Sequence, residues 1–204
     1  MKKWKNILMK KDSIIEILKN TLSEERFSHT LGTAKCAVEL AKRYGLNEEK
    51  AELAGLLHDN AKCLSNEELR KIIDEKFPEI PECELMNYKT YHAPCGAYFA
   101  QEKFGVEDRE IIRAIKVHTL GAPDMTLFDM IIFLADKIEE NTRDYEYREK
   151  ILKILDENKG EIGLKKALFV CFSETIKSLV KRKLLICPTT IEVYNFLLKE
   201  ISKN

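Results

Sequence analysis

Residues 23–45, SEERFSHTLGTAKCAVELAKRYG, carry the longest helical pattern in the chain and decide its fold class. Apolar residues recur at spacings of four and three, which places one stripe on Phe27, Leu31, Ala34, Val38 and Ala41. A second side, offset by nearly half a turn, carries His29, Cys36 and Leu40. Gly45 follows the pattern where a C-terminal cap belongs. The segment predicts a long helix that packs on two sides and lies at the centre of the core.

Helical periodicity continues on both sides of this segment, and no stretch shows the sustained alternation of a strand. A helix is expected from Asn47 to Ala61, ending in Leu56-Leu57-His58-Asp59. Further helices are expected at residues 12–20, 65–77, 91–104, 107–117, 126–140, 147–157, 163–182 and 189–201. Pro78, Pro81 and a loop at 119–125 interrupt the pattern without marking a domain boundary. We predict one all-α domain, a helical bundle over residues 1–204 with its core at about residues 13–200.

Charge and hydropathy exclude several classes of protein. The 204 residues contain 34 lysines and arginines and 34 aspartates and glutamates. Because the charges balance, no overall field draws the chain to nucleic acid or to an anionic membrane, and we expect neither partner. No window approaches the roughly 20 apolar residues that a membrane span needs. A local basic pocket remains compatible with this balance.

The N-terminus and the cysteines are typical of a cytoplasmic protein. Met1–Lys5 is basic, and the apolar stretch after it, Asn6–Met9, is too short for the core of a signal peptide. None of the six cysteines forms a C-x-x-C pair, so we expect free thiols in a reducing cytosol. They are Cys36, Cys63, Cys83, Cys95, Cys171 and Cys187.

Four histidines and two aspartates are the candidates for chemistry. The histidines lie in or at the end of expected helices, in mostly apolar surroundings: His29, His58, His92 and His118. Asp59 follows His58 directly, and Asp136 follows five apolar residues, 131–135. A carboxylate in such a place is costly to bury unless something pairs with it, and a divalent metal is one such partner.

A lone helical histidine is more often a hydrogen-bonded core or surface residue than a ligand, so the set must be weighed as a whole. Ligands on separate helices meet only through the fold. Adjacent helical residues point about 100° apart, so His58 and Asp59 reach one metal only near the edge between their faces. Imidazole and carboxylate ligands suit Fe, Mn, Co, Ni or Zn better than Ca. Six ligands exceed one mononuclear site, so either two metals bind or some histidines contact phosphate.

Five segments carry a resemblance to a known family. They are RFSHTLG (26–32), HDNAK (58–62), HAPCGA (92–97), VHT (117–119) and LADKIE (134–139). His29, His58-Asp59 and Asp136 resemble the H…HD…D signature of the HD-domain phosphohydrolases. Over nearly the whole chain, residues 13–200, the sequence is similar to the YqeK family of symmetrical diadenosine tetraphosphate hydrolases. It departs from that family in having Glu140-Asn141-Thr142 before Arg143, where the family places a proline.

The resemblance implies an iron-dependent enzyme, with one or two ions, that converts diadenosine tetraphosphate to two ADP. Manganese or another divalent transition metal is the alternative cofactor. A metal-generated hydroxide would attack an inner phosphorus. The implied main metal ligands are His29, His58, Asp59 and Asp136. His92 and His118 would hold a second metal or the phosphate chain.

The resemblance also implies which residues act on the substrate. His58, Asp59 and Lys62 are the expected catalytic residues. Lys62 is the first candidate for a phosphate contact, and Arg26, Thr119 and Arg143 follow. A solvated surface position is the competing interpretation of each.

Two other functions stay open. The chain could be an HD phosphohydrolase of another nucleotide, such as a deoxynucleotide or guanosine tetraphosphate. It could instead be a non-catalytic module that binds a metal or senses a nucleotide. Six ligand-type residues, where four close a structural site, count against this second alternative. A homodimer is compatible with either function.

Overall fold

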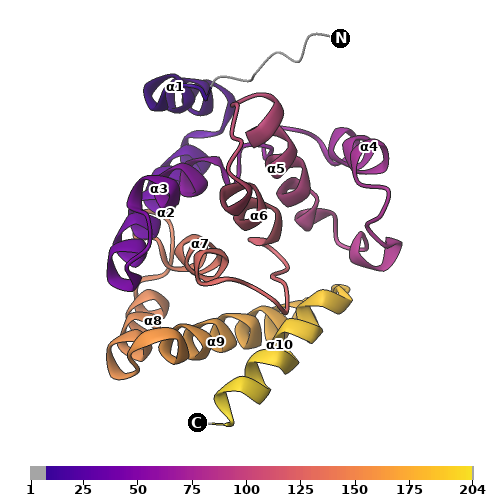
Figure 1. Ribbon diagram of the computed structural model, residues 1–204. Coiled ribbons are helices and arrows are strands. Elements are labelled where there is room, and N and C mark those ends of the chain that lie inside the picture. Colours follow the sequence, from indigo (N-terminus) through magenta and orange to yellow (C-terminus); the bar gives the residue numbers. More distant parts are fainter. Residues whose placement is uncertain (1–7, 204) are drawn as a thin grey trace.

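Residues 8–203, which a computed structural model describes, fold almost entirely into α-helices (Figure 1). In chain order these are α1 (Lys11–Thr21), α2 (Glu24–Tyr44), α3 (Glu48–Leu57), α4 (Asn66–Lys76), α5 (His92–Glu102), α6 (Arg109–Val117), α7 (Leu127–Ile138), α8 (Tyr145–Glu157), α9 (Gly160–Lys181) and α10 (Pro188–Ile201). Two short 3-10 turns, η1 (Glu82–Glu84) and η2 (Tyr88–Thr90), separate α4 from α5. No strand occurs in residues 8–203, so the predicted all-α class is confirmed.

Three further expectations concern the N-terminus, the membrane and the cysteines. The basic stretch Met1–Lys5 lies outside the described residues. Within residues 8–203, no helix combines the length and the apolar character that a membrane crossing requires. The cysteines are free thiols as predicted: Cys36, Cys95, Cys171 and Cys187 are buried, whereas Cys63 and Cys83 are exposed.

Helix α7 is the centre of the fold (Figure 1). It contacts α2, α3, α6, α8 and α9, so neighbours surround it. Every residue from Phe128 to Asp136 is buried. Such a helix needs apolar residues on all sides, which explains the uninterrupted run at 130–135. The arrangement carries Asp136, in the last turn of α7, into the interior.

The predicted buried stripe of α2 is only partly correct. Leu31 is 37% exposed, and the residues that α2 buries nearby are small: Gly32, Thr33, Ala34 and Ala37. The reason is a close crossing with α3, where a Cβ on Gly55 would lie 2.6 Å from the Cα of Ala34. Small residues let two helices approach to this distance, so α2 packs small residues against α3 and leaves Leu31 partly exposed. The predicted cap is correct, since Gly45 has a φ of +67°.

Helix α3 ends at Leu57, four residues before the predicted end at Ala61. Two side chains take carbonyls that a continuing helix would use. His58 Nδ1 donates to the carbonyl oxygen of Gly55 at 2.7 Å, and Asn60 Nδ2 donates to that of Leu57 at 2.7 Å. Local side-chain bonds of this kind compete with helix propagation. His58 is the C-cap of α3 and still has right-handed helical backbone angles, and Asp59 lies in the turn that follows.

Side-chain caps and an ion pair fix the helices on either side of the site. Ser65 and Glu68 form a capping box at the start of α4, and Thr126 and Asp129 form another at the start of α7. Asp129 also accepts a hydrogen bond from Nε of Arg113 in α6 at 2.8 Å. The start of α7 is thereby tied to α6, the helix that ends at His118.

Candidate metal centre

The six predicted ligands come from five places in the chain and meet in the interior. His29 lies in α2, His58 and Asp59 follow α3, His92 begins α5, His118 follows α6, and Asp136 lies in the last turn of α7. All six are buried. Because imidazoles and carboxylates are expensive to bury without partners, their convergence indicates a common function.

His29, His58 and Asp136 form the first group of donor atoms. The Nε2 atoms of His29 and His58 lie 3.2 Å apart. Asp136 Oδ1 lies 2.9 Å from Nε2 of His29 and 3.8 Å from Nε2 of His58. A shared metal site requires Asp136 and the two histidines to lie close together, and these distances meet that requirement.

His92 and His118 form a second group beside the first. Their Nε2 atoms lie 3.1 Å apart. Asp59 Oδ1 is 3.1 Å from His92 Nε2 and 3.5 Å from His118 Nε2. The other oxygen of Asp59, Oδ2, is 3.5 Å from His58 Nε2 and 3.8 Å from His29 Nε2. Asp59 thus presents one oxygen to each histidine pair.

Three rings are oriented by hydrogen bonds from their outer nitrogens. Nδ1 of His58 donates to Gly55, as above, and Nδ1 of His118 donates to the carbonyl oxygen of Ile115 at 2.7 Å. Nδ1 of His29 donates to the carboxylate of Glu139 at 3.0 Å. Such bonds fix the tautomer and direct the lone pair of Nε2 inward, as metal-binding histidines require.

The donor atoms fit a divalent transition-metal ion. Adjacent ligands held about 2.1 Å from an ion at right angles lie about 3 Å apart, close to the separations between these imidazole nitrogens and carboxylate oxygens. Atoms of His29, His58 and Asp136 all lie within 4.8 Å of one another, and so do those of His58, Asp59 and His118. Imidazole nitrogen with carboxylate oxygen is a donor set for iron, manganese or zinc rather than calcium.

The electrostatics keep three of the six ligands, Asp59, Asp136 and His92, in their metal-binding forms. Burial raises the pKa of Asp59, but the neighbouring histidines outweigh it and hold that pKa well below its usual value. For Asp136, Lys137 and His29 outweigh burial and lower the pKa in the same way. Burial lowers the pKa of His92 to about 4. The carboxylates are therefore charged and His92 is neutral near pH 7, which are the forms that bind a metal.

A polar cavity of about 210 Å³, here called the catalytic cavity, opens over these ligands. Asp59, His92, His118, Thr119 and Asp136 line it together with five cationic side chains, Arg26, Lys62, Lys89, Lys137 and Arg143. Besides the histidines, four residues were predicted to contact the substrate, and all four line this cavity: Arg26, Lys62, Thr119 and Arg143. With more cations than carboxylates on its walls, the cavity suits a polyanion such as a phosphate chain.

Two of the predicted cations also contact the ligand carboxylates. Nη1 of Arg26 lies 2.8 Å from Asp59 Oδ2, and Nη2 of Arg143 lies 2.8 Å from Asp136 Oδ1. Arg143 therefore takes a place at the site despite the missing proline before it. Burial lowers the pKa of Lys62.

Three residues at the site were not predicted: Lys89, Lys137 and Glu139. Lys137 donates to Asp136 Oδ2 at 2.7 Å, and its position next to Asp136 could have suggested it. Lys89 lies in η2, three residues before His92, and no sequence pattern singles it out. Glu139 is fully buried at the end of α7 and accepts hydrogen bonds from His29 and from the backbone of Asn141 and Thr142.

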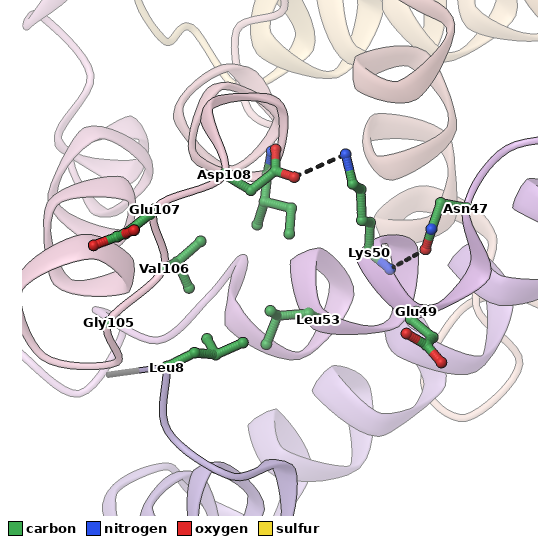
Figure 2. A pocket seen from close by; sticks show the side chains of 10 residues that line it. Leu8, Asn47, Glu49, Lys50, Leu53, Gly105, Val106, Glu107 and Asp108 are labelled. Atoms are coloured by element: carbon green, nitrogen blue, oxygen red, sulfur yellow. Dashed lines mark hydrogen bonds and ion pairs between the residues drawn. The ribbon is translucent and has the colours of Figure 1, made fainter. Parts of the chain in front are cut away.

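A second pocket, shown in Figure 2, lies away from these residues. It has a volume of about 460 Å³ and is lined by Leu8, Leu53 and Val106 among others. The ion pair of Lys50 and Asp108, 2.8 Å between Nζ and Oδ2, lies at its edge (Figure 2). It contains none of the predicted site residues, so the chemistry of this chain concentrates at the catalytic cavity.

Comparison with known proteins agrees with this geometry. A protein of Halalkalibacterium halodurans named symmetrical bis(5'-nucleosyl)-tetraphosphatase is 38% identical over 94% of this chain and 99% of its own. A Bacillus subtilis protein of the same name is 36% identical over 93% of this chain and 98% of its own. A solved structure of a predicted HD superfamily hydrolase from Clostridium acetobutylicum, described as involved in NAD metabolism, has a TM-score of 0.87 and 34% identity, covering 95% of this chain and 100% of that one.

The family model of the HD domain matches residues 26–141, more than half of the chain. That segment begins three residues before His29 and ends five residues after Asp136, so it contains all six residues of the buried cluster. With this match, and with the signature histidines and aspartates in contact inside the fold, the chain belongs to the HD-domain family.

Proposed function

We propose that this protein is a metal-dependent phosphohydrolase that cleaves diadenosine tetraphosphate symmetrically into two molecules of ADP. The observation that carries the proposal is the position of Asp59, between two histidine pairs at the floor of a cavity with five cationic side chains. The relatives that bear the name symmetrical bis(5'-nucleosyl)-tetraphosphatase along nearly their whole length support the choice of substrate.

The two-sided position of Asp59 favours two metal ions. One would be held by His29, His58, Asp136 and Oδ2 of Asp59, and the other by His92, His118 and Oδ1 of Asp59. We propose iron as the native metal because the family that the sequence resembles implies it. Manganese or another divalent transition metal is the alternative, since the donor set suits all of these ions. When bound, the metal supplies a water of lowered pKa as the nucleophile and offsets charge on the phosphoryl oxygens.

The residues of the chain would bind and orient the tetraphosphate. Lys62, Lys89 and Lys137 line the catalytic cavity and provide ammonium groups for the non-bridging phosphate oxygens. Arg26 and Arg143 hold the carboxylates of Asp59 and Asp136 in place through their ion pairs. Fixed charges of this kind stabilise the transition state without having to reorganise during the reaction.

Symmetrical cleavage sets the position of the substrate. Water adds to one of the two inner phosphorus atoms, and the bond from that phosphorus to the oxygen between the two central phosphates breaks. Each half then leaves with two phosphates, as ADP. The centre of the tetraphosphate must therefore lie over Asp59, with the two nucleosides directed to either side.

Product analysis with elemental analysis tests the proposal. The purified protein should contain a transition metal and should convert diadenosine tetraphosphate to ADP alone. Formation of AMP and ATP would contradict symmetrical cleavage. Faster turnover of a deoxynucleotide or of guanosine tetraphosphate would favour another HD phosphohydrolase, and metal-loaded protein inert to all of these would favour a binding module.

A further inference from the structure

Of the four histidines at the site, His92 is the one whose ring is not fixed by a bond from its outer nitrogen. His29, His58 and His118 each donate from Nδ1 to a carboxylate or carbonyl oxygen. In the part of the chain that the structure describes, Nδ1 of His92 makes no such bond, while its Nε2 faces Asp59 and His118. The position of His92 beside Asp59 therefore depends on where the backbone of α5 lies.

Helix α5 belongs to a different packing group from the helices that supply the first group of ligands. α2 packs against α3 and α7, and α3 packs against α7, so His29, His58 and Asp136 come from helices in mutual contact. α5 packs mainly against α6 and α4 (Figure 1). A direct tie between α5 and the end of α3 would therefore hold His92 more firmly beside Asp59.

Asn60 makes that tie. Its Nδ2 donates to the carbonyl oxygen of Gly96 in α5 at 2.9 Å and to that of Leu57 at the end of α3 at 2.7 Å. Because both acceptors are carbonyl oxygens, the amide nitrogen rather than the amide oxygen must face them. Gly96 lies one turn after His92 on the same side of α5, and Asn60 follows Asp59 directly. The Asn60 side chain thus joins the backbone segments that carry His92 and Asp59.

The contact between Asn60 and α5 is buried and close. Asn60 is 7% exposed. A Cβ on Gly96 would lie 3.3 Å from the carbonyl oxygen of His58 and 3.6 Å from Nδ2 of Asn60, so the absence of a side chain lets α5 approach the turn. Oδ1 of Asn60 is buried and has no hydrogen-bond partner among residues 8–203. An unpartnered buried oxygen lowers stability, and features of this kind are expected where a residue serves a functional site.

We propose that Asn60 is a positioning residue for the second metal ion, because it holds α5 so that His92 lies beside Oδ1 of Asp59. This inference rests on the proposed function, in which His92, His118 and that oxygen bind the second ion. Loss of the amide donor leaves the ligands of the first ion in place, since none of them lies on α5. Binding of the second ion should therefore weaken selectively.

Stepwise removal of manganese from the loaded protein by a competing chelator measures the Kd of each ion. We expect two ions in wild type, one of which His92→Ala loses. Asn60→Ala should raise the Kd of that same ion roughly 10- to 100-fold and leave the Kd of the other unchanged. Asn158→Ala is the matched control, because Asn158 also donates from Nδ2 to a helix carbonyl oxygen, that of Ile154 at 2.9 Å, but lies outside the site. It should leave both constants unchanged.

Gly96→Ala tests the same contact from the side of α5. Alanine favours a helix over glycine, so this variant should fold, but its Cβ would press on the carbonyl oxygen of His58. We expect it to weaken the same ion as Asn60→Ala, by a smaller factor.

Three results would overturn the inference: a single ion in wild type, equal effects of Asn60→Ala on both ions, or no effect on either. If Asn60→Ala fails to fold, unchanged binding of the second ion by Gly96→Ala would overturn it. These measurements use no nucleotide. Absence of ADP formation by a wild type that binds two ions would instead overturn the proposed function.

Discussion

Asp59 is the residue on which both halves of the buried cluster depend. Its oxygens lie 3.1 Å from His92 on one side and 3.5 Å from His58 on the other. Asp136 lies toward His29 and His58 only, so of the two aspartates Asp59 alone lies beside both histidine pairs. Removing the side chain of Asp59 therefore affects all the proposed metal ligands at once.

We expect Asp59→Ala to lower turnover at least roughly 100-fold and to lower metal content, while helicity stays nearly intact. Helicity survives because the residue lies in a turn after α3 and its contacts are with other site residues. Elemental analysis, activity and circular dichroism on one preparation measure the three effects. Asp156→Ala, which removes an exposed aspartate, is the control and should keep its activity and metal. Full activity in Asp59→Ala would show that the proposed metal site is not the active site.

Gly32 makes room for the carboxylate that orients His29. A Cβ at this position would lie 2.2 Å from Oε2 of Glu139, too close for any real contact. Glu139 is also bound by the hydroxyl of Thr142 and by two backbone nitrogens, so it cannot move without losing several hydrogen bonds.

Gly32→Ala should lower stability by about 1–3 kcal/mol and weaken metal binding, although alanine normally stabilises a helix relative to glycine. Metal affinity should fall roughly 10- to 100-fold, the usual effect of losing the partner of a metal-binding histidine. Chemical denaturation and competition with a chelating dye measure these effects. Lys42→Ala, an exposed change in the same helix, is the control. A variant as stable as wild type with unchanged metal affinity would show that Glu139 does not position His29.

At the scale of elements, the crossing of α2 and α3 sets the distance between His29 and His58. The backbones approach at Ala34 and Gly55, and His58 follows Gly55 by one helical turn. The Nε2 atoms of the two histidines then lie 3.2 Å apart. A shift of the crossing by one ångström would change this separation by a similar amount, which a metal site does not tolerate.

Gly55→Ala is expected to push α3 away from α2, because the new Cβ would meet backbone rather than a flexible side chain. The free energy of unfolding should fall by about 1–3 kcal/mol, and the metal content of the folded protein should fall with it. Urea unfolding and elemental analysis measure the two effects. Glu52→Ala, at a partly exposed position of the same helix, should keep its metal. If Gly55→Ala is less stable but keeps its normal metal content, the crossing of α2 and α3 does not set the geometry of the metal site.

At the scale of the whole molecule, the site joins segments that are more than a hundred residues apart. His29 and Asp136 are brought to 2.9 Å by the packing of α2 against α7. A metal bound by both, and by residues after α3 and α6, links four parts of the fold. Because the unfolded chain does not bring these ligands together, metal binding should stabilise the folded protein.

We expect a chelator to inactivate the protein and to lower its melting temperature, and added iron or manganese to restore both. A metal present at 100 times its Kd adds about 2.7 kcal/mol to stability. Calcium should restore neither, because the site offers imidazole nitrogens rather than a full set of oxygens. Thermal melts and activity assays on the same samples provide the measurement. Unchanged activity after verified loss of the metal would argue against metal catalysis.

The sequence alone determined the class of the fold, most helix ends and the chemical identity of the cluster. Ser65, Thr126 and Gly45 marked the ends of helices correctly because capping depends on residues within one turn. The six ligands could be named because imidazole and carboxylate groups in apolar surroundings need partners, and because their contexts resembled a known family.

Only the tertiary structure decided how those residues are arranged. Contacts between distant segments determine three features that the sequence did not predict. They are the exposure of Leu31, the end of α3 at Leu57 and the hydrogen bond from His29 to Glu139. The two-sided position of Asp59 depends on such contacts as well. Helical periodicity and capping are local, with a reach of about four residues, whereas the distance between two helices is set by which side chains meet where they cross.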